Sequence, residues 1–219
     1  MYHAKEREVV LPGQVIATKE KYDYLTCEVD GENVVALTQG LFHLGKYGAE
    51  IVPLAGVYRP KSEDVVIGVI TSVGNSSWGV DIKVPYNCQL PADEVTRDVA
   101  GVDLTRFYKV GDIISGIVRS VNELHETTLT RPWKLQGGRI IEVEPVKVPR
   151  IIGKKRSMLT VLKEKTGSKI IVGQNGLVWI SGEQTPLVIE AIEKIQKEAH
   201  TQGLTDRIAH MLDEKTRKH

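Results

Sequence analysis

The chain has 219 residues, of which 41% are hydrophobic and 26% are charged, as in ordinary soluble globular proteins, and it can hold one large domain or a few small ones. Its 29 basic and 28 acidic residues nearly balance, so any nucleic-acid-binding surface must be local. Cys27 and Cys88 lie far apart outside any C-x-x-C pattern, so we expect neither a disulfide framework nor a zinc site. The charged sequence MYHAKEREVV and the absence of apolar runs near ~20 residues predict a cytoplasmic protein without a membrane span.

Residues 1–60 are expected to form a β-rich N-terminal domain. The runs EVVLPGQVIA, YLTCEVD and NVVALTQG contain β-forming residues and are separated by turns such as Pro12-Gly13 and Asp30-Gly31. Closely spaced glycines in GLFHLGKYGAEIVPLAG leave little room for a helix. Within this stretch, an apolar contact patch for a partner protein is one interpretation of Leu41, Phe42, Leu44 and Tyr47, and an ordinary domain core is the other.

Residues 61–135 are expected to form a small barrel. The runs DVVIGVITSV, SWGVDIKVP and DIISGIVRSVN have the length and apolar pattern of strands, and the strand ETTLTRP follows a turn at 122–125. The more polar stretch LPADEVTRDVAGVDLTRFYKVGD has room for a helical turn. Five short strands with a longer insertion before the last two match a Greek-key barrel of the OB type.

Residues 136–219 change from strand to helix periodicity. RIIEVEPVKVP is expected to be a strand, and KKRSMLTVLKEKTG a helix that ends at Gly167. SKIIVG and LVWISG form two further strands, joined at Asn175-Gly176, a dipeptide typical of a type I′ turn in which both residues have positive φ. EQTPLVIEAIEKIQKEAH and TDRIAHMLDEK are amphipathic helices. The order β-α-β-β-α predicts a KH-like α/β domain, so the fold class is a multidomain protein, mainly β followed by α/β.

These segments together resemble a known family. The opening strand at 68–73, V-D-I at 80–82 and YKVGDIISGIV are similar to S1-type RNA-binding barrels. PRIIGKK, LKEKTGSKIIV and the helix after WISG are similar to a KH domain. With VVLPGQVI in front and G-x-N-G at 173–176, the order resembles the RNA-binding cap subunits of the exosome, above all the archaeal form.

The resemblance implies a protein that is not an enzyme and needs no cofactor or metal. Three copies, alone or mixed with another cap subunit, would sit on a ring of RNase PH-like subunits that degrades RNA phosphorolytically. The N-terminal domain would dock on the ring, the barrels would line the entry pore for single-stranded RNA, and the KH domains would lie at the periphery.

The barrel departs from the usual pattern of its family. In such barrels F-G-x-F precedes V-D-L, and aligning V-D-I at 80–82 with that pattern puts Ser76 and Gly79 at the positions of the two aromatics. Trp78 is displaced by one position, which in a strand means the opposite face. Its ring therefore either packs inside the protein or stacks on a base.

Basic side chains are the remaining candidates for RNA contact in the barrel. They are Lys83, Arg97, Arg106, Arg119 and Arg131. Arginine binds phosphate through two parallel hydrogen bonds and lysine acts as a point charge; the alternative for each of the five is a solvated surface charge. Three copies around a pore would multiply modest contacts through effective concentration.

In a KH domain, a G-x-x-G loop between two helices clamps the nucleic-acid backbone. Two tetrapeptides of this chain are candidates for that loop. GKKR at 153–156 occupies the clamp position, with Arg156 in place of the final glycine. Its Lys154, Lys155 and Arg156 either contact phosphate at a helix N-terminus or form a solvated helix start. Gly173, Asn175 and Gly176 spell the clamp motif but fall between two strands, which indicates a structural turn.

Enzymatic motifs are not found. The sequence contains no H-E-x-x-H, G-x-S-x-G or G-x-x-x-x-G-K-[ST]. A free-standing regulator of transcription or translation that pairs an S1 barrel with a KH domain is the alternative function. Co-elution with the ring proteins would distinguish a cap subunit from such a regulator.

Overall fold

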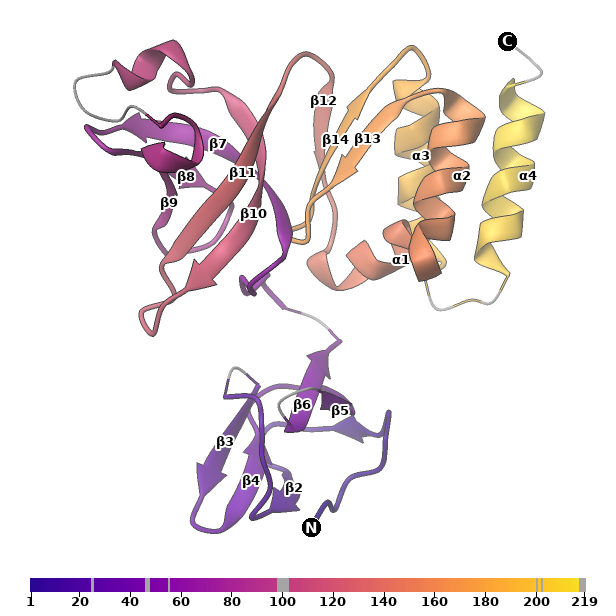
Figure 1. Ribbon diagram of the computed structural model, residues 1–219. Coiled ribbons are helices and arrows are strands. Elements are labelled where there is room, and N and C mark those ends of the chain that lie inside the picture. Colours follow the sequence, from indigo (N-terminus) through magenta and orange to yellow (C-terminus); the bar gives the residue numbers. More distant parts are fainter. Residues whose placement is uncertain are drawn as a thin grey trace. The chain divides into compact units, whose positions relative to one another are not determined.

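The computed structural model describes residues 1–24, 26–45, 48–54, 56–97, 103–199, 201 and 203–216. The chain divides into two compact units, Met1–Gly56 and Val57–His219 (Figure 1). Across the described ranges, no helix is both long enough and apolar enough to cross a membrane. The predicted domain limits at residues 60 and 135 remain predictions.

The N-terminal unit consists of two three-stranded antiparallel sheets. One has the order β1-β5-β6 and the other β2-β4-β3. Their strands are β1 (Val9–Val10), β2 (Val15–Thr18), β3 (Cys27–Asp30), β4 (Asn33–Ala36), β5 (Gly40–Gly45) and β6 (Gly48–Pro53). Ile16, Phe42 and Ile51 are buried in the shared core of this unit. The predicted β-rich fold is confirmed.

The middle segment closes into a barrel. Its strands are β7 (Val65–Val73), β8 (Ser77–Asp81), β9 (Cys88–Pro91), β10 (Ile113–Val121) and β11 (Thr127–Leu135), in the order β10-β11-β9-β8-β7. The predicted insertion carries two 3₁₀ turns, η1 (Ala92–Glu94) and η2 (Leu104–Arg106). Strand β9 was not recognised in the sequence because it is only four residues long and ends at a proline.

Strand β11 continues past Pro132, where the sequence pattern was expected to end it. Ser115 is opposite Trp133, but Ile117 is opposite Thr130, so β11 contains one extra residue at this point. The extra residue forms a β-bulge in which Arg131 has a φ of 48°. A bulge tolerates proline because a ladder hydrogen bond is already lost there.

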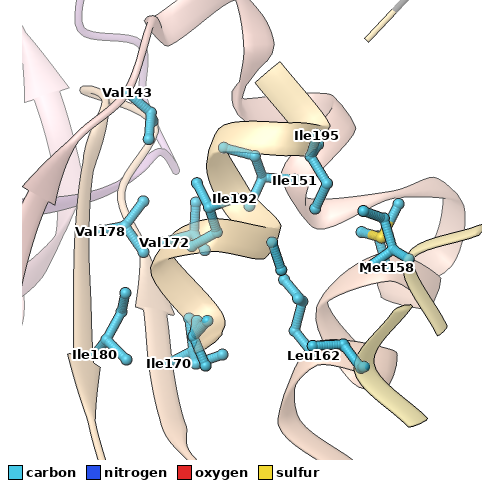
Figure 2. Close-up of a cluster of buried hydrophobic side chains, with 14 of the residues drawn as sticks. Val143, Ile151, Met158, Leu162, Ile170, Val172, Val178, Ile180, Ile192 and Ile195 are labelled. Carbon is cyan, nitrogen blue, oxygen red and sulfur yellow. The ribbon is translucent and has the colours of Figure 1, made fainter. Parts of the chain in front are cut away.

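The C-terminal segment is a three-stranded sheet covered by helices. It runs β12 (Arg139–Glu142), η3 (Pro145–Lys147), α1 (Val148–Ile152), η4 (Lys154–Arg156), α2 (Ser157–Thr166), β13 (Lys169–Val172), β14 (Leu177–Ser181), α3 (Thr185–Lys197) and α4 (Leu204–Thr216). The sheet has the antiparallel order β12-β14-β13. Figure 2 shows side chains of this sheet, such as Ile170 and Ile180, in the same buried cluster as Leu162 and Ile192 of the helices. This is the predicted KH-like domain, with the short helix α1 in addition.

The barrel and the C-terminal domain share an apolar interface within one compact unit. Ile67 and Leu135 of the barrel form a buried cluster with Leu177 and Trp179 of β14. The Trp179 indole Nε1 also donates to the carbonyl of Gly137 at 2.8 Å. Buried contacts therefore hold the barrel and the C-terminal domain together.

Candidate nucleic-acid interface

The G-x-N-G tetrapeptide lies between β13 and β14 and is buried against the barrel. The Asn175 Oδ1 accepts a hydrogen bond from the Ile67 amide at 3.2 Å. The Asn175 Nδ2 donates to the carbonyls of Ile67 at 2.7 Å and Ile82 at 3.0 Å. A side chain with its amide fully engaged inside the protein cannot contact RNA.

The turn itself differs from the expected type I′ geometry. Gly176 has a φ of 81°, but Asn175 does not have a positive φ. The loop instead closes over four residues, with the Gly173 amide donating to Leu177 and the Gly176 amide to Gly173. Asn175 is held by its side-chain bonds to the barrel, a contact that a two-residue hairpin signal does not contain.

The tetrapeptide in the clamp position, Gly153 to Arg156, joins α1 to α2 and is termed the cationic turn. Gly153 has a φ of 75°, and an added Cβ would lie 2.6 Å from the Met158 amide nitrogen, so only glycine fits. Lys155 and Arg156 also have positive φ, at 52° and 65°. Such left-handed residues cost roughly 1–2 kcal/mol each when they are not glycine.

The side chains of the cationic turn are available to a ligand. Lys154, Lys155 and Arg156 are exposed, and no ion pair or hydrogen bond joins their side chains to the described part of the chain. Arg150, one turn earlier on α1, is likewise exposed. Sequence reasoning missed Arg150, because Gly153, with a φ of 75°, interrupts the helix between Arg150 and Lys154, and spacing along one helix therefore does not relate the two. No side chain caps the N-terminus of α2, so its first amides can also face an anion.

Two of the five barrel cations are engaged in ion pairs. The Lys83 ammonium pairs with Glu142 on β12. The Arg119 guanidinium pairs with Glu94 at 3.1 Å, and the Thr130 hydroxyl donates to the same carboxylate. These contacts partly neutralise both cations, which makes them weaker candidates for phosphate than the sequence suggested.

The other three barrel cations are exposed. Arg97 follows η1, Arg106 ends η2, and Arg131 stands in the β-bulge of β11. Within the described ranges no ion pair is formed by any of them. They belong to three different elements and do not form one continuous cluster along the chain.

Trp78 packs inside the barrel. It is 0% exposed, and its Nε1 donates to the Tyr108 carbonyl at 3.1 Å. Its ring meets that of Tyr108 edge-on, with centroids 5.4 Å apart. On the outer face of β8, a Cβ added to Gly79 would lie 2.4 Å from the Ser72 hydroxyl, so small residues occupy the position of the usual stacking aromatics. Of the two alternatives, packing in the protein is the correct one.

The expected apolar patch of the N-terminal unit is only partly at the surface. Phe42 is 1% exposed and belongs to the core, because its position on β5 faces Ile51 of β6 inside the sheet. Leu41 is half-buried and Leu44 is exposed, whereas Tyr47 lies outside the described residues. The sequence did not reveal that Val9 and Val52 flank Leu41 on the two neighbouring strands. Val9, Leu41 and Val52 form an apolar row across the outer face.

The described residues were compared with the requirements of a metal site and of a reactive thiol. Within these ranges, no group of three or more His, Cys, Asp or Glu side chains is placed to hold a metal ion. Both cysteines are buried free thiols. Burial raises the pKa of Cys88 to about 12, so this thiol is not an activated nucleophile.

The fold and the site define a nucleic-acid-binding protein in which an OB-type barrel is joined to a KH domain. A KH domain family model matches residues 138–186. The exosome complex component Rrp4 of Thermococcus kodakarensis is 40% identical over 220 residues, covering 95% of this chain and 86% of that protein. The component Rrp4 of Methanopyrus kandleri is 34% identical over 221 residues, covering 93% and 92%.

A solved structure shows the same fold. A crystal structure assigned to an exosome complex RNA-binding protein superposes with a TM-score of 0.64 at 37% identity. The match covers 74% of this chain and 98% of that one. The chain belongs to the Rrp4 family of exosome complex components.

Proposed function

We propose that the protein is a non-catalytic cap subunit that delivers single-stranded RNA to an exosome. Three copies, alone or with another cap subunit, would sit in the cytoplasm on a ring of RNase PH-like subunits, which performs the phosphorolysis in the 3′-to-5′ direction. The observation that carries the proposal is the similarity over 95% of the chain to proteins named exosome complex components. The free regulator is less favoured, because the similar proteins named here are exosome components.

The cationic turn supports a phosphate-based mode of RNA binding. Its three exposed cations precede an uncapped helix N-terminus, and both features favour anions. Arg97, Arg106 and Arg131 would add contacts from the barrel, with smaller roles for the paired Lys83 and Arg119. Since β8 offers no aromatic platform, binding should be moderate, sensitive to salt and tolerant of sequence.

The apolar row supports docking of the N-terminal unit on the ring. Val9 and Val52 are exposed large aliphatic side chains that flank Leu41 across three paired strands. A contiguous apolar surface of this kind is typical of protein contacts. Leu44 would extend the contact, whereas Phe42 would support it from the core.

The RNA-binding part is tested with the full chain and a labelled oligoribonucleotide over a series of salt concentrations. The triple variant Lys154→Ala, Lys155→Ala, Arg156→Ala should bind more weakly, and its slope of log K against log salt should be smaller by about 2, for three lost contacts. A control triple, Lys163→Ala, Lys169→Ala, Lys197→Ala, removes the same charge from exposed positions elsewhere in the domain. An equal loss in both variants would contradict a local site.

The docking part is tested by size-exclusion chromatography with purified ring proteins. Wild-type protein should co-elute with the ring and raise its degradation of unstructured RNA, whereas the chain alone should release no nucleotides. The double variant Val9→Asp, Val52→Asp should elute separately, and Val29→Asp, which changes an exposed valine on the other sheet, should still co-elute. Elution of the wild type apart from the ring would favour the free regulator.

A further inference from the structure

Trp133 is the exposed tryptophan of this protein. The other two are buried with their indole nitrogens bonded, Trp78 to Tyr108 and Trp179 to Gly137. Trp133 is 70% exposed although it stands within a strand of the closed barrel. No hydrogen bond or ring contact joins its side chain to any other described residue. A large indole that is mostly exposed is little stabilised by packing in its own domain, and it is therefore a candidate for contact with a ligand.

The backbone around Trp133 has a distinct local geometry. The bulge of β11 places Arg131 at a φ of 48°, a conformation that non-glycine residues rarely adopt, directly before Pro132. Bulges alter the direction of nearby side chains and are frequent beside functional sites. Arg131 is exposed and forms no ion pair with the described residues, so a cation and an indole stand two positions apart.

Trp133 lies at the edge of the covered outer face of the barrel. It is paired with Ser115 of β10, which is paired in turn with Ile67 of β7. Ile67 and Ser115 are buried, and Ile67 belongs to the interface with β14, whereas Trp133 at the end of the same row is exposed. The backbone of Trp133 therefore belongs to the closed barrel sheet, next to the junction of the two domains.

We propose that Trp133 is a stacking platform for a nucleobase of single-stranded RNA, with Arg131 contacting a neighbouring phosphate. The inference rests on the proposed function, because it assumes that the chain binds RNA. A base needs one accessible ring and a nearby cation, and this pair provides both. A protein partner would instead need a wider apolar surface, but the strand neighbours of Trp133 are Arg131, Pro132, Lys134 and the buried Ser115.

Such a platform would replace the aromatics that β8 lacks. Stacking on one ring tolerates any base, since every base has a π face. It would therefore add affinity to the phosphate contacts of the cationic turn without introducing sequence selectivity.

Tryptophan fluorescence of the full chain tests this proposal directly. Titration with an oligoribonucleotide of about ten nucleotides should quench the exposed indole, and Trp133→Ala should lose most of the quenching. Trp133→Ala should also bind about tenfold more weakly, whereas Trp133→Phe, which keeps a ring, should retain most of the affinity. An abasic oligomer of the same length should bind the wild type and Trp133→Ala equally. Arg131→Ala should weaken binding to both oligomers.

Specific outcomes would overturn the inference. Equal affinity of wild type and Trp133→Ala for the base-containing oligomer would exclude stacking. Loss of co-elution with the ring proteins in Trp133→Ala, with unchanged RNA binding, would assign the indole to a protein contact. Failure of the wild type to bind RNA would overturn the proposed function as well. Urea unfolding curves of each variant should match that of the wild type, because the changed side chains are exposed.

Discussion

Asn175 binds both backbone groups of Ile67, a residue 108 positions earlier in the chain. Its amide oxygen accepts from the Ile67 nitrogen, and its amide nitrogen donates to the Ile67 carbonyl, as a neighbouring strand would do. A third bond reaches the carbonyl of Ile82. One side chain therefore satisfies three buried backbone groups of the barrel and fixes the KH domain against it.

Asn175→Ala should destabilise the unit formed by the barrel and the KH domain. The change removes three hydrogen bonds at about 1 kcal/mol each and leaves buried backbone groups without partners, so we expect a loss of about 3 kcal/mol. Urea denaturation followed by circular dichroism measures the free energy of unfolding. Gln174→Ala is the matched control, because the residue contacts the barrel through its backbone amide, which donates to Val65. A similar loss in both variants would refute a specific role for the Asn175 side chain.

Gly176→Ala should cost more than its positive φ alone explains. At a φ of 81°, an alanine Cβ would lie 2.5 Å from the Val143 carbonyl oxygen. Gly111 has a similar φ of 91° but open space at the Cβ position, so Gly111→Ala isolates the conformational term. We expect a loss of about 1 kcal/mol for Gly111→Ala and about 3 kcal/mol for Gly176→Ala in thermal or urea unfolding. Equal losses would show that the close approach is relieved at no cost.

Arg156→Gly should raise stability while it lowers RNA affinity. Arg156 has a φ of 65°, where glycine avoids the steric penalty, so we expect a gain of about 0.5–1 kcal/mol in unfolding free energy. The lost charge should weaken RNA binding and reduce the salt slope by about 0.7. Arg150→Gly removes the same charge from helix α1 and should instead lower stability by about 1 kcal/mol. If Arg156→Gly lowered stability too, the left-handed position would not be strained.

Acidification should lower the free energy of unfolding less in the wild type than in Asp64→Asn. Burial raises the pKa of Asp64, against the opposing bonds that it accepts from the Tyr58 hydroxyl at 2.7 Å and the Lys61 amide. A carboxyl with a raised native pKa stabilises the fold below its unfolded pKa of about 3.9, and this contribution is lost as pH rises through the native value. The stability of wild type minus that of Asp64→Asn should therefore increase as pH falls from about 7 toward 4.

Urea denaturation of both proteins at the two pH values measures this difference. Asp93→Asn, at an exposed position of η1, serves as the control for a general change of charge. A difference that shrinks on acidification would mean that hydrogen bonds to the ionised carboxylate outweigh its burial.

The sequence predicted those features that depend on local order. Strand parity placed Trp78 on the face opposite the usual aromatics but left open whether it packs in the protein or stacks on a base, and the structure buries it. The resemblance to a KH domain placed GKKR at a turn between two helices, and the structure has that turn between α1 and α2. The limit of such reasoning is visible at Phe42, where a run of apolar residues did not reveal which of them faced the core.

The pairing of charges was outside the reach of the sequence. Lys83 and Glu142 lie 59 residues apart, and Arg119 and Glu94 lie 25 apart, on elements that meet only in the folded unit. The exposed Trp133 was missed for the same reason, because its accessibility depends on the bulge and on the extent of the domain interface.

What the sequence by itself determined is the order and type of the domains, because the periods of strands and helices and the chemistry of turns act over a few residues. Only the tertiary structure decided which tetrapeptide is buried and which is free to meet RNA. Gly173 to Gly176 has the G-x-x-G motif, yet it is buried against the barrel, where Asn175 is hydrogen-bonded to Ile67 and Ile82. The cationic turn lacks the motif but lies at the surface. Contacts between distant segments, and not the local sequence motif, determine which of the two tetrapeptides is buried.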